Sequence, residues 1–162
     1  MLLRFNRGFI KEQFNMSNSD LRLISIVRLL CKQAQLLYEE LAQVIADQQS
    51  RNLLRTLARH RSETLYAIAN DATPDITAQG NPMVVPAQIL QANEKVKTRL
   101  QENRPEDAIK CLVQGSKHEV AFLRQEVRNI RNETLRRRLS SFVAVLQMDF
   151  DQLQLLARNR YH

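Results

Sequence analysis

Apolar residues in the first half of the chain recur at alternating steps of three and four residues, the spacing of one face of an α-helix. The clearest run holds for about three heptads and comprises Leu23, Val27, Leu30, Ala34, Leu37, Leu41 and Val44. A helical period resumes at Leu54, Leu57, Thr64, Leu65 and Ile68. The polar stretch between the two runs predicts a short loop near residues 47–50 that joins two antiparallel helices.

The second half of the chain shows the same organisation. One apolar stripe comprises Ile109, Leu112, Val120, Leu123, Val127 and Ile130, and another comprises Leu139, Phe142, Leu146, Leu153 and Leu156. Asn132 followed by Glu133 is typical of a helix N-cap and an acidic first turn. We therefore predict a second antiparallel hairpin, with its turn just before residue 132.

Proline separates the two hairpins. The four prolines lie at positions 74, 82, 86 and 105, and three of them fall in residues 71–86. A shorter helix follows in AQILQANEKVKTRLQEN, and Pro105 with Glu106 and Asp107 predicts the start of the next helix. A connection of this length can return the whole length of a bundle. The predicted fold is therefore all-α, a ferritin-like four-helix bundle of two antiparallel hairpins with a long crossover that contains a shorter helix.

Length and charge limit the alternatives. The 162 residues suit one domain, predicted over residues 16–162, and residues 1–15 (MLLRFNRGFIKEQFN) read as a basic N-terminal extension before Met16. This opening lacks the apolar core of a secretory signal, although a short basic amphipathic anchor is an alternative. No apolar run reaches the roughly 18 residues of a membrane span. We expect a cytoplasmic protein, in which Cys31 and Cys111 are buried free thiols.

The segment LLYEELAQVIADQQSRNLLRTLARHRSETLYAIAN, residues 36–70, resembles a bacterial family of ferritin-like four-helix-bundle proteins, a domain of unknown function. The matching features are Tyr38 with Ala42, the turn at Asp47, and Ala58-Arg59-His60-Arg61 on the second helix. EDAIKCLVQGSKHEVAFLRQEV and NETLRRRLSSFVAVLQMDFDQLQLL resemble the third and fourth helices. The resemblance covers roughly residues 20–157 and implies an architecture, but it implies no activity.

The ligand pattern of a di-iron site is missing from the sequence. Catalytic ferritin-like bundles use Glu-x-x-His pairs to hold two metals, and no Glu in this chain has His three positions later. In the last helix the best correspondence is Gln147-Met148-Asp149-Phe150, which lacks an imidazole ligand. Weak metal candidates remain in Glu63, Glu119, Asp149 and His60, with iron or another divalent metal as the cofactor under this alternative. Our preferred prediction is that no cofactor is bound.

Asp149 lies on the stripe of the last helix, so we expect it to point inward, with Arg61 or Lys117 as its partner. Glu119 borders the stripe of the third helix, whereas His118 is rotated away from it. An i,i+3 pair of His60 and Glu63 is expected on the surface. We expect His60, His118 and His162 to be exposed to solvent.

Three hypotheses about function follow. The first is a non-catalytic bundle that acts through protein interaction, with self-association through helix faces, in a process such as a stress response. The second is a degenerate carboxylate metal-binding protein. The third is anion or nucleic-acid binding through Arg-rich helix faces, with Arg136, Arg137 and Arg138 as weak candidates within the net charge of +7. Nucleic acid is the less favoured partner, because aromatic residues are not interleaved with the cations.

Overall fold

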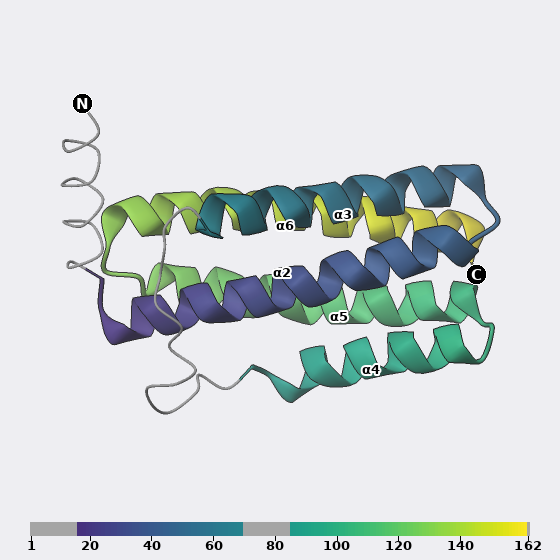
Figure 1. The fold of residues 1–162 in the computed structure, drawn as a ribbon, viewed down its shortest axis with the longest axis horizontal. Helices are drawn as coiled ribbons and strands as arrows, with labels where there is room; N and C mark the ends of the chain where they lie inside the picture. The colour runs from purple at the N-terminus through teal and green to yellow at the C-terminus, as the bar shows by residue number, and fades with distance from the viewer. Residues whose placement is uncertain (1–15, 70–84, 162) are drawn as a thin grey trace.

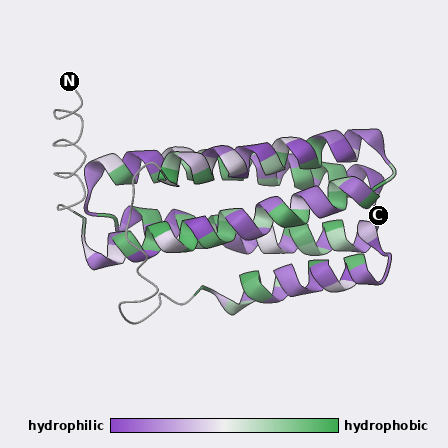
Figure 2. Cartoon of the chain, viewed as in Figure 1, coloured by the Kyte–Doolittle hydropathy of each residue, from purple (hydrophilic) through white to green (hydrophobic). Residues whose placement is uncertain are grey.

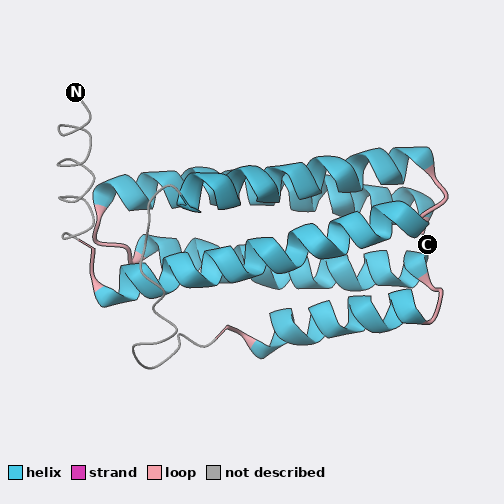
Figure 3. Ribbon diagram, in the orientation of Figure 1, coloured by secondary structure: helices cyan, strands magenta, loops and turns pink. Residues whose placement is uncertain are grey.

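The computed structural model describes residues 16–69 and 85–161, and all the regular secondary structure in these ranges is helical (Figures 1 and 3). The helices are α2 (Asn18–Val44), α3 (Gln48–Ala69), α4 (Ala87–Gln101), α5 (Pro105–Arg128) and α6 (Glu133–Arg160). The predicted all-α class is confirmed for the described ranges. The shorter helix in the middle of the chain is also present as predicted.

The helices pack as two antiparallel hairpins with α4 along one edge. Helices α2 and α3 form the first hairpin and α5 and α6 the second, while α4 runs antiparallel to α5 and contacts α5 and α2 (Figure 1). The connection that contains α4 brings the chain back along the bundle. As a result, α3 and α5 run in the same direction.

Local signals begin three of the long helices, at Asn132 and Pro105 as the sequence predicts and at Ser17 in α2. The Ser17 hydroxyl accepts a hydrogen bond from the Asp20 amide at 3.1 Å, and the Asn132 side chain accepts one from the Leu135 amide at 2.9 Å. Pro105 lies in the first turn of α5. The loop predicted at residues 47–50 was placed too late, because Asp47 caps α3 by accepting from the Ser50 amide at 2.8 Å. The loop consists of residues 45–47.

The apolar seam of α2 is buried except at its last position. Hydrophobic and hydrophilic residues alternate along α2 in Figure 2. Its members from Leu23 to Leu41 are buried, whereas Val44 is 55% exposed. The chain turns extended at Ile45, which is only 2% exposed and takes the buried position instead. The seam prediction was therefore wrong at Val44.

The buried apolar side chains form two clusters, and buried polar residues lie between them along the helices. In α3 one cluster contains Leu57 and Ala58 and the other contains Ile68, with buried Arg61 between them. In α5 the buried residues before Ser116 belong to one cluster and those after Glu119 to the other, and in α6 Asp149 separates the two clusters in the same way. We call Arg61, Ser116, Glu119 and Asp149 the polar layer.

Several sequence predictions lie outside the described residues. These are the N-terminal extension of residues 1–15, most of the proline-rich segment 71–86, and His162. Within the described ranges, no helix is both long and apolar enough to span a membrane.

Gly115 allows α4 to lie close to α5, and its substitution tests this contact. A Cβ atom at position 115 would stand 2.9 Å from the Cβ of Ala92, which no side-chain rotation can move. We expect Gly115→Leu to lower the free energy of unfolding by about 1–3 kcal/mol in urea denaturation. Gln114→Leu, at the exposed neighbouring position, should change it by less than about 0.5 kcal/mol. Equal losses in the two variants would contradict the close contact.

Candidate functional site

A buried ion pair joins α3 to α5 at the centre of the bundle. The Nη1 atom of Arg61 donates to Oε1 of Glu119 at 2.5 Å, and the two side chains are 1% and 8% exposed. A charge at such depth is tolerated only when an opposite charge neutralises it. Each member of this pair therefore depends on the other.

Aromatic rings and a thiol enclose the Arg61 guanidinium. Its central carbon lies 6.0 Å from the ring centre of Tyr38 and 5.7 Å from that of Phe142, within the range of cation–π attraction. Nη1 also lies 3.7 Å from Sγ of Cys31. Burial opposes the charged form of Arg61, but the Glu119 carboxylate raises its pKa well above the ordinary value. Arg61 is therefore a fixed cation inside the bundle.

A second polar contact joins α3 to α6. The Nδ1 atom of His60 lies 2.9 Å from both carboxylate oxygens of Asp149, whose side chain is 9% exposed. An ionised carboxylate only accepts hydrogen bonds, so Nδ1 carries the proton toward it. Burial raises the pKa of Asp149, and the His60 hydrogen bond offsets part of that rise.

These contacts correct three predictions about the partners of the site residues. Asp149 does point inward, but its hydrogen-bond partner is His60, whereas Arg61 pairs with Glu119 and Lys117 is exposed. His60 is only 28% exposed because Asp149 holds it, so the expectation of a solvent-exposed His60 was wrong. Glu63 does not pair with His60.

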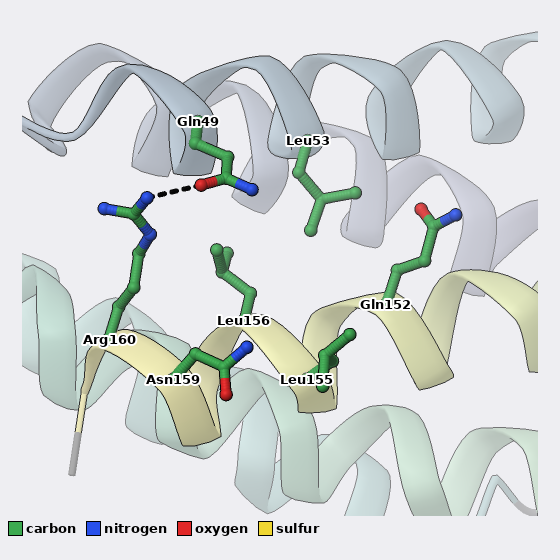
Figure 4. Close-up of a pocket in the computed structure, with 7 residues that line it drawn as sticks. All are labelled: Gln49, Leu53, Gln152, Leu155, Leu156, Asn159 and Arg160. Carbon is green, nitrogen blue, oxygen red and sulfur yellow. Dashed lines mark hydrogen bonds between the residues drawn. The ribbon is translucent and has the colours of Figure 1, made fainter.

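Two hollows lie between α3 and α6. The larger, about 910 Å³, is bordered by His60 and Asp149, with Phe142, Val145 and Met148 among its apolar lining. The other, about 460 Å³, lies nearer the C-terminal end of α6, where Leu53 of α3 reaches toward Leu156 (Figure 4). Gln152 borders both hollows. We call the two together the α3–α6 groove.

Polar contacts tie α3 to α6 along this groove. At the end shown in Figure 4, Arg160 donates to Gln49, and its Nη1 atom lies 2.8 Å from Oδ1 of Asp47. Beside them, the Tyr161 hydroxyl and Ser50 Oγ are 2.6 Å apart. Further along the groove, the His60–Asp149 contact also joins α3 to α6.

The His60–Asp149 pair lacks the nucleophile that acyl transfer requires. A catalytic imidazole activates a hydroxyl or thiol within hydrogen-bond reach. The two hydroxyl-bearing residues that line the larger hollow are otherwise engaged: Thr64 donates to the His60 carbonyl and Ser141 to the Arg137 carbonyl, each at 3.1 Å. The geometry supports a structural role for the pair.

Of the four metal candidates, only His60 and Asp149 are bonded to each other. His60 and Asp149 meet, Glu119 is bound to Arg61, and Glu63 is 67% exposed with its carboxylate 3.7 Å from Arg59. In the described part of the chain, no group of three or more His, Cys, Asp or Glu side chains is arranged to hold a metal. The most buried of these carboxylates, that of Glu119, is bonded to the Arg61 guanidinium. A guanidinium donates hydrogen bonds and cannot ligate a cation.

The Arg136–Arg138 cluster divides among different surroundings. Arg137 pairs with Glu133 at 3.0 Å, Arg136 lines a hollow between α5 and α6, and Arg138 lines the α3–α6 groove. The three side chains therefore have different neighbours.

Comparison of the chain with family models, curated proteins and solved structures gives no match. The resemblance to a ferritin-like family therefore stays a prediction.

Sequence reasoning missed Arg61 as the centre of the site. Arg61 stands four residues after Leu57 and seven before Ile68, so it occupies a position of the apolar stripe of α3. A cation at a stripe position was the signal that could have found it.

Replacing one member of the buried pair should lower the free energy of unfolding far more than replacing both. We expect Arg61→Met and Glu119→Met each to lower the free energy of unfolding by about 3–5 kcal/mol, because each leaves an uncompensated buried charge. The double variant should lie within about 2 kcal/mol of the native protein, since apolar side chains of similar size replace both charges. Urea denaturation of the four proteins measures the coupling. Additive losses would refute a mutually dependent pair.

The two thiols should react at very different rates. Cys31 is fully buried, and burial raises the pKa of its thiol to about 11, so it is protonated at neutral pH. Cys111, predicted as buried, is only partly buried, because it lies off the central stripe of α5. We expect iodoacetamide at pH 8 to modify Cys111 in the native protein and Cys31 only after unfolding in urea, as read by peptide mass spectrometry. Rapid native labelling of Cys31 would contradict the packing around Arg61.

Proposed function

We propose that this chain is a non-catalytic, ferritin-like helical bundle that acts through protein interaction, with the α3–α6 groove as its interface for self-association. The observation that carries this proposal is the row of exposed apolar side chains on α6 beside the groove. Val145, Met148 and Leu155 are 38%, 62% and 59% exposed. Their spacing places them along one side of the helix.

The helix order supports the ferritin-like part of the proposal. In bundles with one long crossover, two antiparallel hairpins are joined so that the second and third long helices run in the same direction. Helices α3 and α5 have this arrangement. The polar layer lies across the interior, where such bundles build metal sites from side chains on facing helices. Here Glu119 is bonded to Arg61 and Asp149 to His60, which favours a structural use of these carboxylates.

A second copy of this chain fits the groove in both shape and charge. The exposed apolar row and the groove lie on the same face, so a two-fold axis would place the row of each copy over the groove of the other. The groove also carries both signs of charge, with Glu63 and Asp149 against Arg138. Two such faces can meet without the repulsion expected for two copies of a chain with a net charge of +7.

Charged substitutions in the apolar row test this interface. Sedimentation equilibrium on the order of 100 μM should give twice the mass of one chain for the native protein and the mass of one chain for Val145→Glu/Leu155→Glu. Burial of the new carboxylates without partners would oppose association. The matched control Leu36→Glu, at a position 52% exposed on α2, should still dimerise.

Two outcomes would overturn the proposed interface. One is a native protein that remains monomeric throughout this concentration range. The other is equal dissociation of the Leu36→Glu control.

A further inference from the structure

A third hollow, of about 530 Å³, lies between α5 and α6 on the other side of Met148, which borders both it and the α3–α6 groove. Its charged lining consists of Arg124, Arg128 and Arg136. Its apolar lining includes Val127, Val143 and Met148, the last of which is 62% exposed. We call this surface the basic hollow.

The arginines of the basic hollow differ from five others on the surface. Arg59, Arg99, Arg104, Arg137 and Arg160 each have a carboxylate within 4.0 Å. Among the described residues, no ion pair within this distance joins an acidic side chain to Arg124, Arg128 or Arg136, and no acidic residue lines the hollow. Glu133, which acts electrostatically on Arg136, is bonded to Arg137. The hollow therefore presents concentrated positive charge.

One neutral contact fixes the position of part of this charge. Nη2 of Arg124 donates to Oε1 of Gln147 at 2.5 Å, which joins α5 to α6 across the hollow. A guanidinium held in one place loses less conformational entropy when it pairs with an anion. The fixed position of Arg124 therefore favours binding of a negatively charged partner.

We infer that the basic hollow binds an acidic amphipathic helix of a partner protein. Apolar residues of that helix at positions i, i+3 or i+4, and i+7 would cover the exposed Met148 and Ala144 above the buried Val127 and Val143, and flanking Asp or Glu side chains would pair with the three arginines. A helix lying between two antiparallel helices is an ordinary packing arrangement. Arginine and methionine are also enriched at protein interfaces.

The composition of the hollow favours such a helix over nucleic acid and over a second copy. A phosphate backbone has no apolar group to cover Met148, and no aromatic side chain lines the hollow to stack on bases. A second copy would bring a net charge of +7 toward the same arginines. The partner is therefore acidic and distinct from this chain, and because Met148 borders both surfaces, its helix and a second copy on the α3–α6 groove would meet at that side chain.

Fluorescence anisotropy with a designed probe tests the inference on the full-length protein. The probe is a fluorescein-labelled helical peptide of about four turns with Leu at i, i+3, i+4 and i+7 and Glu at the flanking positions. We expect micromolar binding, weakened at least tenfold by Arg128→Glu/Arg136→Glu. The matched control Arg55→Glu/Arg158→Glu reverses two exposed arginines outside the hollow and should change the affinity less than twofold.

Two further probes separate the alternatives. A peptide of the same composition, scrambled so that Leu and Glu no longer segregate, should bind at least tenfold more weakly, and a short DNA duplex should not compete with the original peptide at equal concentration. Equal binding of the scrambled peptide, or equal losses in the two double variants, would show unspecific charge attraction and overturn the inference. Tighter binding of the duplex, lost in Arg128→Glu/Arg136→Glu, would overturn it in favour of nucleic acid. Circular dichroism of each variant confirms that the helices persist.

Discussion

The ion pair between Arg61 and Glu119 is the constraint on which the rest of the interior depends. A guanidinium that is 1% exposed requires a nearby carboxylate, and Glu119 on α5 supplies it at 2.5 Å. The pair lies between the two apolar clusters and joins α3 to α5 across the bundle. The rings of Tyr38 and Phe142 then bring α2 and α6 to the same guanidinium. Each long helix of the two hairpins thus contributes a side chain to one charge, which specifies their register more narrowly than apolar packing alone.

The polar layer also affects how α6 contacts α3 at the surface. Because Asp149 is used to hold His60, α6 meets α3 through separate polar ties along the α3–α6 groove. The apolar row of α6 is exposed along the groove, and the basic hollow lies between α5 and α6, with Met148 bordering both. Interior charge and the two proposed binding surfaces are therefore connected through α6.

Much of the fold follows from periodicity, and much of the site does not. The spacing from Leu23 to Leu41 predicted α2, and Pro105 and Asn132 predicted helix starts, because these are local signals. The error at Val44 arose where the chain leaves the helix, which a repeat cannot indicate. The inward direction of Asp149 was also predictable from its stripe. Its partner was not, because His60 and Asp149 are 89 positions apart and only the packing of α3 on α6 brings them together. Arg61 was assigned to the wrong acid for the same reason.

Diffraction from crystals grown with Mn²⁺ and Fe²⁺, with anomalous data collected at each metal edge, would show whether ion pairs or a metal fill the polar layer. We expect continuous density for the Arg61 guanidinium bonded to Glu119, His60 bonded to Asp149, and no anomalous peak within coordination distance of either carboxylate. A metal peak beside Glu119 or Asp149, with Arg61 displaced from the interior, would contradict it.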